Sequence, residues 1–401
     1  MRNCLIAQSG GPTAAINATL AGIVKANQLN KFYEKIYGAL NGLEGIFSLS
    51  LVDLTDMSEL ENEILIQTPA SALGSCRYKL KKDNPLDFEK IFAVLDRYDI
   101  ETMFYIGGND SMDTVASLDQ YAREHAIKGH RFVGCPKTID NDLMHIDHTP
   151  GFGSAAKYIA STALSTWQDY SVYRRREVFI LETMGRDAGW LAASACLSGI
   201  VDILILPEVA FEKAVFLAEV KRCLEEKNKC YVVVSEGCKY ADGTYIAAAD
   251  SADDSFDHAI LGGASGALKN MIIESELSLR VRVLNLSNAQ RCSVTDLSKC
   301  DISESFELGK YAHSCSTDKS FSGKMVALRR KQQEEYEVEY FTIEADKIAN
   351  FVRSFPLEWM LPNYRGVSND ALEYMRPLIK GSIKILYEDG LPAYVRPYYL
   401  R

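Results

Sequence analysis

Basic residues are in the minority in this 401-residue sequence, and their shortage argues against one class of partner. Lys and Arg total 44 against 54 Asp and Glu, which gives a formal net charge of −10. A protein that binds nucleic acid needs a basic excess to displace counterions from the phosphates, so we expect no nucleic-acid partner. Any anionic ligand would require the available cations to gather locally.

Paired cysteines and long apolar runs are also missing. The ten cysteines include no CxxC pair, which favours buried free thiols in a reducing compartment. The longest apolar runs, such as Ile203–Leu206 and Tyr231–Val234, are far too short to cross a bilayer. No apolar region of signal-peptide length follows Met1, because residues 4–13 run straight into a polar glycine loop. We therefore expect a cytoplasmic protein with no membrane partner.

The sequence does contain a regular alternation of segments. A hydrophobic content of 47% in a chain of this length can bury the cores of two domains. Short apolar runs alternate with longer amphipathic ones, which is typical of parallel β-sheets wound with helices. The expected strands are Leu5–Ala7, Thr102–Ile106, Arg131–Gly134, Val178–Leu181, Ile203–Leu206, Tyr231–Val234 and Val281–Leu284. The expected helices are Ala14–Asn27, Pro85–Arg97, Ser111–Glu124, Ser154–Trp167, Ala188–Leu197 and Glu212–Glu226.

Boundary signals add detail to this pattern. Ser111 and Ser154 are the expected N-caps of their helices. The polar stretch Tyr240–Asp257 predicts a surface loop, and the mixed charged and aromatic sequence after Arg329 predicts an exposed hairpin. A further element is expected around Val367–Ile379, in a tail that shows no recognisable catalytic residue.

Two glycine-rich segments each join an expected strand to an expected helix. They are Ser9–Thr13 (SGGPT) and Ile106–Ser111 (IGGNDS). Backbone N–H groups in such loops approach an anion closely, and the helix dipole favours negative charge. Loops at the carboxyl ends of parallel strands converge on one crevice. For either loop alone a tight turn is the alternative, and for Asp110 the alternative is a helix-capping carboxylate.

A third segment, Cys135–Asp142 (CPKTIDND), follows the expected strand Arg131–Gly134. Asp140 and Asp142 lie two residues apart, close to Lys137. In such a group one carboxylate can take a hydroxyl proton, the other can help to hold a metal ion, and the lysine can neutralise phosphate charge. A plain turn is the alternative for Asn-Asp after proline, but the complete string is more specific.

Together with GFGSA at 151–155 and LETMGRDAGWLA at 181–192, these strings resemble the phosphofructokinase family. The resemblance runs in order from residue 3 to about Lys324. It implies an α/β fold of two Rossmann-like three-layer domains with parallel-rich sheets and an active site in the cleft between them. The implied donor-binding domain is 1–153 plus about 292–345, and the implied fructose 6-phosphate-binding domain is about 154–291 plus about 346–401.

The resemblance also assigns roles on the donor side. Asp140 would be the base that accepts the proton from O1 of fructose 6-phosphate, and Arg77 would lean on the phosphoryl group in transfer. Asn109 and Asp142 occupy the positions associated with Mg²⁺, the implied cofactor. The donor itself would be contacted by Gly10, Gly11 and Gly108.

On the sugar side the resemblance implies a larger set. Arg282 and Arg291 would grip the 6-phosphate. Asn288 replaces the His or Tyr that relatives usually carry three residues before the second arginine, although an amide can still hydrogen-bond a phosphate. The other sugar-binding residues would be Thr138, Ile139, Met184, Gly185, Arg186 and Glu236.

Asp110 and Lys137 indicate the phosphoryl donor. Both positions are typically glycine in the ATP-using branch of the family, whereas the pyrophosphate-using branch carries these two charges. A carboxylate at position 110 lies about where the α-phosphate of ATP would be, and like charges ~4 Å apart at an effective dielectric of about 20 repel by roughly 4 kcal/mol. That energy is on the order of a thousandfold in affinity. Lys137 supplies a compensating charge for a small anionic leaving group.

The resemblance therefore implies a glycolytic enzyme that transfers a phosphoryl group reversibly from pyrophosphate to fructose 6-phosphate. Family members form dimers or tetramers, so we expect a homodimer or homotetramer, and Arg174–Arg176 lies where an arginine of a neighbouring subunit often completes the site. The alternatives are an ATP-dependent enzyme, a non-catalytic regulatory subunit, and a lipid or dinucleotide kinase with a similar glycine loop. Activity on sedoheptulose 7-phosphate stays open.

Overall fold

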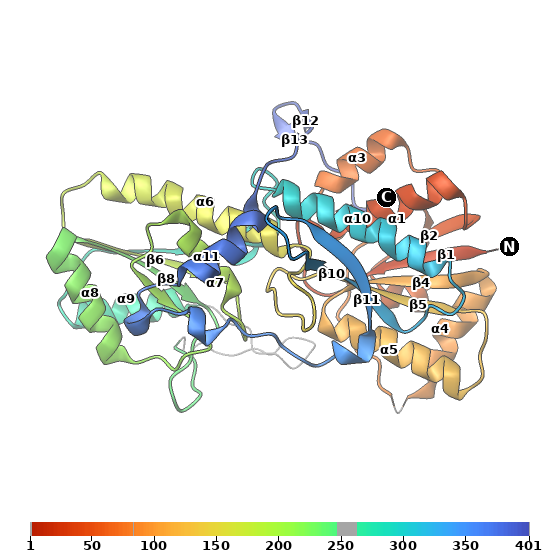
Figure 1. Cartoon of the computed structure of the whole chain (residues 1–401), viewed down its shortest axis with the longest axis horizontal. Helices are drawn as coiled ribbons and strands as arrows, with labels where there is room; N and C mark the ends of the chain where they lie inside the picture. The colour runs from red at the N-terminus through yellow and green to blue at the C-terminus, as the bar shows by residue number, and fades with distance from the viewer. Residues whose placement is uncertain (1, 83, 247–262, 401) are drawn as a thin grey trace.

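The structure, a computed structural model, describes residues 2–82, 84–246 and 263–400. Figure 1 shows two β-sheets side by side, each wound with helices. The expected α/β architecture with parallel-rich sheets is confirmed. The expected surface loop at Tyr240–Asp257 lies outside the described residues from position 247 onward.

The first sheet has seven strands in the order β11-β10-β5-β4-β1-β2-β3. Five of them pair in parallel, whereas the edge strands β3 and β11 run antiparallel to their neighbours. The strands are β1 (Asn3–Gln8), β2 (Lys35–Ala39), β3 (Leu51–Asp53), β4 (Ile100–Gly107), β5 (Arg131–Pro136), β10 (Lys324–Arg330) and β11 (Val338–Glu344).

Successive side chains of β1 point into two different cores, as the pleat of a strand requires. Leu5 and Ala7 pack into one core, and Cys4 and Ile6 pack into the other. The first core is covered by α2 (Leu43–Phe47), α4 (Pro85–Arg97) and α5 (Asn109–Glu124). The second core is covered by α1 (Ile16–Asn30), α3 (Glu59–Gln67) and α10 (Lys299–Ser316).

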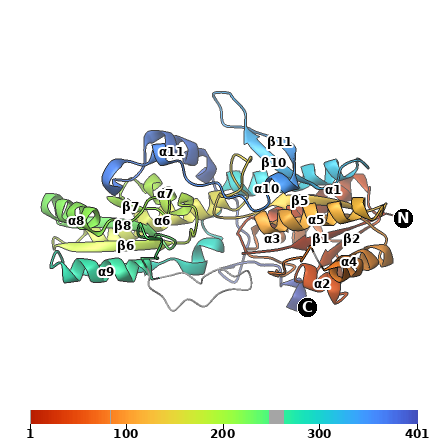
Figure 2. The same ribbon diagram turned by 90° about the horizontal axis from the view of Figure 1, so that it is seen from below.

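The second sheet has four parallel strands in the order β7-β8-β6-β9. They are β6 (Glu177–Thr183), β7 (Ile203–Ile205), β8 (Lys229–Ser235) and β9 (Val281–Asn285). Figure 2 shows α9 on one side of this sheet and α11 on the other. The covering helices are α6 (Phe152–Ser171), α7 (Trp190–Ser194) and α11 (Asn369–Met375) on one face, and α8 (Lys213–Lys227) and α9 (Ala264–Glu274) on the other.

The chain crosses between the two sheets more than once. After β9 it returns to the first sheet with α10 and the β10–β11 hairpin, then runs to the second sheet as α11. The last segment, which includes β12 (Tyr387–Glu388) and β13 (Leu391–Pro392), goes back again, and the Tyr398 N–H donates to the Ala72 carbonyl oxygen at 2.9 Å. We keep the two-domain division as a proposal in which this last segment contacts the first domain.

Most expected elements are confirmed. All seven expected strands and all six expected helices are present, although the expected helix Ala188–Leu197 is shorter and continues as a 3₁₀ turn, Ala195–Ser198. An antiparallel hairpin, β10–β11, is present near the expected place, but its first strand lies mostly before Arg329 and is buried from Met325 to Leu328. All ten cysteines are free thiols. Among the described residues, no helix combines the length and the apolar character needed to span a membrane.

The expected N-cap at Ser154 is wrong. Helix α6 begins at Phe152, with Gly151 in the cap position at φ 109°. The cap is supplied by Asp301 of α10, whose carboxylate accepts the N–H groups of Gly151 at 2.8 Å and Ser154 at 2.9 Å. These N–H groups are the orphan donors of a helix start, and a partner about 150 positions away in sequence satisfies them.

Candidate active site

Three loops meet at the carboxyl ends of β1, β4 and β5, which are neighbours in the first sheet. We call them the first glycine loop (9–13), the second glycine loop (107–110) and the catalytic loop (137–148). Backbone hydrogen bonds join them: the Ser9 N–H donates to the Ile106 carbonyl at 2.9 Å, and the Lys137 N–H donates to the Gly107 carbonyl at 2.9 Å. The expected convergence of the three motifs is therefore present.

Lys137 is the buried centre of this convergence. The residue is only 2% exposed, and its Nζ donates a hydrogen bond to the Gly11 carbonyl oxygen at 2.6 Å. Gly10 adopts φ 78°, and a Cβ at that position would lie 3.3 Å from the same Nζ. Burial lowers the pKa of Lys137 to about 8, while the charge of Asp140 opposes the shift. The ammonium form therefore still predominates at neutral pH.

Burial shifts the pKa values of two acidic residues of the catalytic loop in the opposite direction, upward. Burial raises the pKa of Asp140, and the charge of Lys137 and a hydrogen bond from Thr138 limit the rise. Burial also raises the pKa of Asp142 to about 7, and the charge of Asp140 adds to that shift. Both carboxylates thus lie where their charged forms depend on nearby cations and hydrogen bonds.

The second glycine loop leads directly into α5. Gly108 occupies the N-cap of this helix, so Ser111 lies in the first turn and the N-cap expected there is wrong. Asp110 is not the cap either, because it follows the first helical residue. The Asn109 side-chain oxygen accepts the Asp110 N–H at 2.6 Å. The Asp110 carboxylate lines the cavity described below, at a helix end whose dipole favours negative charge.

The second sheet contributes the facing wall. Met184, Gly185 and Arg186 follow β6, and Glu236 follows β8. The Gly185 carbonyl accepts the Gly237 N–H at 3.2 Å, which ties the two loops together. Burial raises the pKa of Glu236 to about 7, with further contributions from the charges of Asp140 and Glu182.

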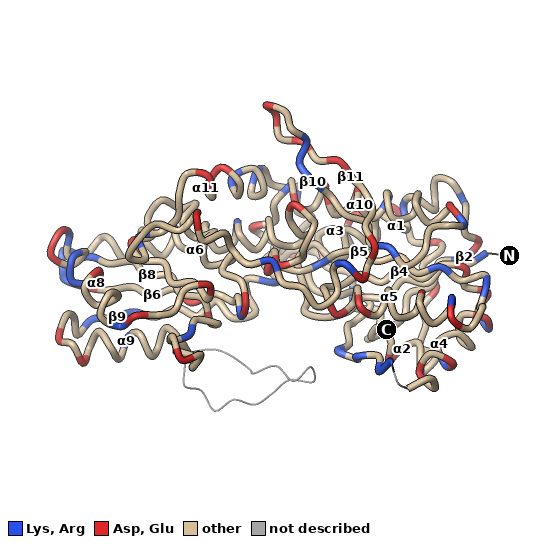
Figure 3. The backbone as a smooth tube through the Cα atoms, turned by 60° about the horizontal axis from the view of Figure 1, so that its bottom comes forward, with Lys and Arg blue, Asp and Glu red and all other residues tan. Residues whose placement is uncertain are grey.

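These residues line one cavity of about 460 Å³ between the two sheets. Its cations are Arg77, Lys79, Lys137, Arg186 and Arg291, and as many carboxylates face them: Asp110, Asp140, Asp142, Asp187 and Glu236. Figure 3 shows basic and acidic positions interspersed over both sheets and their helices, so this cluster is a local feature. Such a cavity suits anionic ligands that arrive with a cation. A larger cavity of about 730 Å³, beside Arg2 and Lys31, includes none of the predicted site residues.

Two predicted residues do not line the cavity. Arg282 lies on the edge strand β9 and forms ion pairs with Glu177 at 2.8 Å and Asp169 at 2.6 Å. Asn288 is exposed, and its side-chain oxygen accepts a hydrogen bond from Arg291, which does line the cavity. Every other predicted site residue belongs to the cavity wall.

Some cavity residues were not predicted. Thr13 is buried, and its hydroxyl has no hydrogen-bond partner among the described residues, although it lies in the first glycine loop. Lys79 follows Arg77 by two residues, a spacing that places both side chains on one side of an extended segment. Asn350 and Val352 come from the tail, for which the sequence offers no signal.

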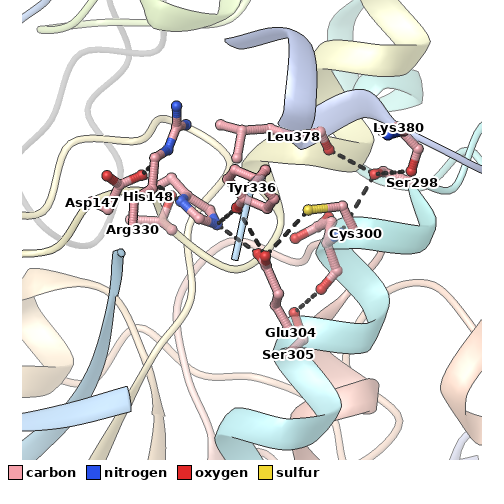
Figure 4. A network of polar contacts seen from close by, with 12 residues as sticks. Asp147, His148, Ser298, Cys300, Glu304, Ser305, Arg330, Tyr336, Leu378 and Lys380 are labelled. Atoms are coloured by element: carbon pink, nitrogen blue, oxygen red, sulfur yellow. Dashed lines mark hydrogen bonds and ion pairs between the residues drawn. The ribbon is translucent and has the colours of Figure 1, made fainter. Parts of the chain in front are cut away.

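The far end of the catalytic loop is anchored by a separate network (Figure 4). His148 lies between Asp147 and Glu304, with nitrogen–oxygen distances of 2.7 Å on both sides. Arg330 pairs with Asp147 at 3.0 Å, and the Tyr336 hydroxyl donates to Glu304 at 2.8 Å. This network joins the loop to α10 and to the β10–β11 hairpin.

Comparison with known proteins agrees with this geometry. The family model "Phosphofructokinase" matches residues 3–314. A pyrophosphate–fructose 6-phosphate 1-phosphotransferase from Xanthomonas campestris pv. campestris is 38% identical, over 98% of this chain and 95% of that protein. A sulfofructose kinase from Alkalicoccus urumqiensis is 35% identical, over 83% and 85%. The crystal structure of a pyrophosphate-dependent phosphofructokinase from Nitrosospira multiformis has a TM-score of 0.89 at 32% identity, covering 99% of this chain and 96% of its own. Because the family match spans well over half of the sequence, this chain belongs to the phosphofructokinase family.

Proposed function

We propose that this protein transfers a phosphoryl group from pyrophosphate to O1 of fructose 6-phosphate, giving fructose 1,6-bisphosphate and phosphate. The observation that carries the proposal is the buried Lys137 ammonium among the three loops, in the same cavity as the Asp110 carboxylate. The relative from Xanthomonas campestris, which spans 98% of this chain, is named for this reaction. Phosphoryl transfer depends mainly on positioning and charge stabilisation, and both are built into these loops.

The selection of a small donor follows from space and charge. The Lys137 side chain fills the space against the first glycine loop, where Nζ lies 2.6 Å from the Gly11 oxygen. A glycine at position 137 would remove both that volume and that charge. The Lys137 ammonium stabilises the departing phosphate. The Asp110 carboxylate repels the α-phosphate of ATP, which pyrophosphate lacks.

Asp140 is the proposed general base. Its backbone N–H donates to the Thr138 hydroxyl at 3.1 Å, which anchors the turn that presents the carboxylate. The charges of Lys137, Arg291 and Arg186 favour the ionised form that a base requires, against the effect of burial. Asp140 takes the proton from O1 as that oxygen attacks the nearer phosphorus in line. The negative charge that develops is offset by Arg77 and Lys137.

The sugar phosphate binds on the side of the second sheet. Gly185 and Arg186 bring a backbone turn and a cation to the acceptor, and Arg291 supplies a cation for the 6-phosphate. Glu236, with a pKa raised to about 7, can hydrogen-bond a sugar hydroxyl in either protonation state.

Mg²⁺ is part of the proposal, and the residues present fit it. Mg²⁺ prefers oxygen ligands and usually binds one or two carboxylates together with substrate phosphates. Asp142 and the side-chain oxygen of Asn109 supply such ligands in the cavity. Burial raises the pKa of Asp142 to about 7, with Asp140 adding to the rise, so a cation beside these carboxylates would relieve their repulsion. When bound, Mg²⁺ would neutralise part of the charge on pyrophosphate.

We further propose that the protein works in the cytoplasm as a homodimer or homotetramer in which Arg282 serves a neighbouring subunit's 6-phosphate site. Support comes from the position of Arg282 on the sheet-edge strand β9 and from its neighbour Tyr173. The guanidinium carbon of Arg282 lies 5.9 Å from the centre of the Tyr173 ring. Tyr173 is 46% exposed, and Val172 is 68% exposed. Light scattering on the purified chain tests this part, and a fully active monomer would contradict it.

The test of the reaction is product identification by phosphorus NMR. Wild-type protein with Mg²⁺, pyrophosphate and fructose 6-phosphate should form fructose 1,6-bisphosphate and phosphate. Rapid product formation with ATP and none with pyrophosphate would instead support the ATP-dependent alternative. No product with either donor would support a regulatory subunit. Sedoheptulose 7-phosphate and a sulfonated fructose should be assayed as acceptors in the same series, because a relative is named for the latter.

A further inference from the structure

Arg353 lies in the segment that leads from the first sheet back to the second. Its neighbours Asn350 and Val352 line the cavity, so this part of the tail passes directly beside the active site. The side chain of Arg353 is half-buried and turns toward the catalytic loop. No role in phosphoryl transfer follows from the sequence for any residue of this segment.

The guanidinium of Arg353 donates to the backbone of the catalytic loop. Nε and Nη2 donate to the Asn141 carbonyl oxygen at 3.1 and 2.9 Å. Nη1 donates to the Ile146 carbonyl at 2.7 Å and also to the Asp147 carbonyl. The Arg353 backbone N–H donates to the Asp142 carbonyl at 2.7 Å. One residue thus satisfies carbonyl groups along most of the loop.

These contacts fix both peptide groups that flank Asp142. The Asn141 carbonyl belongs to the peptide before Asp142, and the Asp142 carbonyl belongs to the peptide after it. Asn141 also adopts φ 54°, in the left-handed region that asparagine enters more readily than other non-glycine residues. The direction of the two loop carboxylates, Asp140 and Asp142, therefore depends on what holds these peptides.

Further support comes from the far end of the loop, where His148 and Arg330 hold Asp147 (Figure 4), and from Thr149, whose N–H donates to the Asn141 side-chain oxygen at 3.0 Å. The His148 network does not include the residues between Asp140 and Ile146, which have other hydrogen-bond partners. Arg353 supplies the hydrogen bonds in the middle of the loop, assisted by Tyr374, whose hydroxyl accepts from the Asn141 side chain at 3.1 Å.

Arg353 also contacts the wall that binds the sugar. The Trp190 indole N–H donates to the Arg353 carbonyl at 3.1 Å, and the Arg353 guanidinium lies 4.7 Å from the centre of the Trp190 ring. Trp190 is the first residue of α7 and follows directly on the loop that carries Met184–Arg186. A single side chain therefore connects the catalytic loop of the first sheet with the sugar-binding loop of the second.

We propose that Arg353 is a positioning residue of the active site. It holds the catalytic loop so that Asp140 and Asp142 face the cavity. It also fixes the position of this loop relative to the sugar-binding loop that carries Met184–Arg186. The inference rests on the proposed function, because the chemistry it supports is the proton transfer assigned to Asp140. Since Arg353 does not line the cavity, its loss should affect turnover more than substrate binding.

The test compares Arg353→Ala and Arg353→Lys with a matched control, Arg365→Ala. Arg365 also lies in the tail, but it pairs with Glu219 at 2.8 Å on the outer side of the second sheet. Arg353→Ala should lower kcat about 100-fold, the scale of a small misplacement of catalytic groups, with KM for both substrates within about threefold of wild type. Millimolar guanidinium should restore part of the lost kcat. Arg353→Lys, which keeps the charge but has fewer donors, should lose about tenfold, and Arg365→Ala should match wild type.

Hydrogen exchange gives a second reading that does not depend on catalysis. Backbone amides of residues 140–148 should exchange faster in Arg353→Ala than in wild type, while Arg365→Ala leaves them unchanged. A kcat within about twofold of wild type in both Arg353 variants, or unchanged exchange in this segment, would overturn the inference. If Arg353→Ala fails to fold, Arg353→Lys carries the same comparison.

The two proposals fail in different ways. A wild-type protein that transfers no phosphoryl group from pyrophosphate contradicts the proposed function, and the exchange measurement then still decides whether Arg353 holds the loop. An active wild type with equally active Arg353 variants contradicts the positioning role alone.

Discussion

The catalytic loop carries buried charges at both of its ends, and the two ends compensate them differently. At the far end, burial alone would lower the pKa of His148, but the carboxylates of Glu304 and Asp147 raise it to about 9. The pKa values of both carboxylates fall, because His148, with Arg330 and Arg353 at Asp147 and Tyr336 at Glu304, outweighs the effect of burial. At the near end burial dominates: it lowers the pKa of Lys137 to about 8 and raises that of Asp142 to about 7.

This difference indicates that the charges of the His148 network have a structural role, whereas the charges of the cavity have a role in ligand binding. The His148 network satisfies its own members, so its charged forms are stable without any added group. In the cavity the effect of burial on the charges is not fully offset, and binding of phosphates and a cation would offset more of it. A loop fixed at one end by a closed network can present reactive groups at the other with little reorganisation.

The largest effect is expected from removing the base at the near end. Asp140→Ala should lower kcat by about 10³- to 10⁴-fold, the upper part of the range that a general base contributes. Calorimetry should show that both substrates still bind. Asp140→Asn, which keeps the shape of the side chain, should lose as much turnover. Near-normal turnover of either variant would remove Asp140 from the role of base.

The next largest effect is expected at Lys137. Lys137→Met should lower kcat with pyrophosphate by about 10²- to 10³-fold, the usual loss when one donor to the developing charge is removed. The wild-type rate should fall as the pH rises above about 8, because burial lowers the pKa of Lys137 to about 8 and the protonated form is the one that assists. The variant should lack this alkaline limb, and an unchanged limb would assign it to another group.

At the far end of the loop, replacing His148 should lower the free energy of unfolding. A rise in the pKa of His148 from 6.5 to about 9 corresponds to about 3 kcal/mol of folding free energy. Because the folded pKa is raised, this contribution is fully present below pH 6.5 and is lost as the pH rises through about 9. His148→Gln should therefore destabilise the protein by about 3 kcal/mol at pH 6 and progressively less toward pH 9.5. Urea unfolding at several pH values measures this, and a difference that grows with pH would contradict the network.

The smallest effect is expected at Glu236, on the sugar side. Glu236→Gln keeps a hydrogen-bonding side chain and removes one buried charge, so KM for fructose 6-phosphate should rise about tenfold with little change in kcat. Steady-state kinetics with varied fructose 6-phosphate measures it. A fall in kcat at unchanged KM would place Glu236 in the chemical step.

The fold was largely predictable because its central strands are buried on both faces and so form continuous apolar runs, such as Tyr231–Val234. The elements that escaped prediction include the edge strand β3, with half-exposed side chains, helix α10, and the buried strand β10. The cap of α6 escaped for a different reason. Asp301, 150 positions further along the chain, satisfies it, and no local pattern reveals such a partner.

The candidate site was predictable where it is built from loops that directly follow strands. The convergence of the loops that carry Asp110 and Lys137 was expected because loops at the carboxyl ends of parallel strands share one crevice. Asn350 and Val352 reach the cavity, and Arg353 reaches the catalytic loop, only because the chain crosses back between the sheets, so tertiary structure places them. Arg282 shows the reverse case, since its spacing from Arg291 fits the family but a single subunit places it on a sheet edge.

The most direct test of the account is the donor preference set by the opposite charges at positions 110 and 137. The measurement is kcat/KM with magnesium pyrophosphate and with MgATP, for wild type and for Asp110→Gly/Lys137→Gly. We expect wild type to prefer pyrophosphate by about a thousandfold or more, and the double variant to lose most of that preference. Rapid turnover of wild type with MgATP, without use of pyrophosphate, would contradict the account.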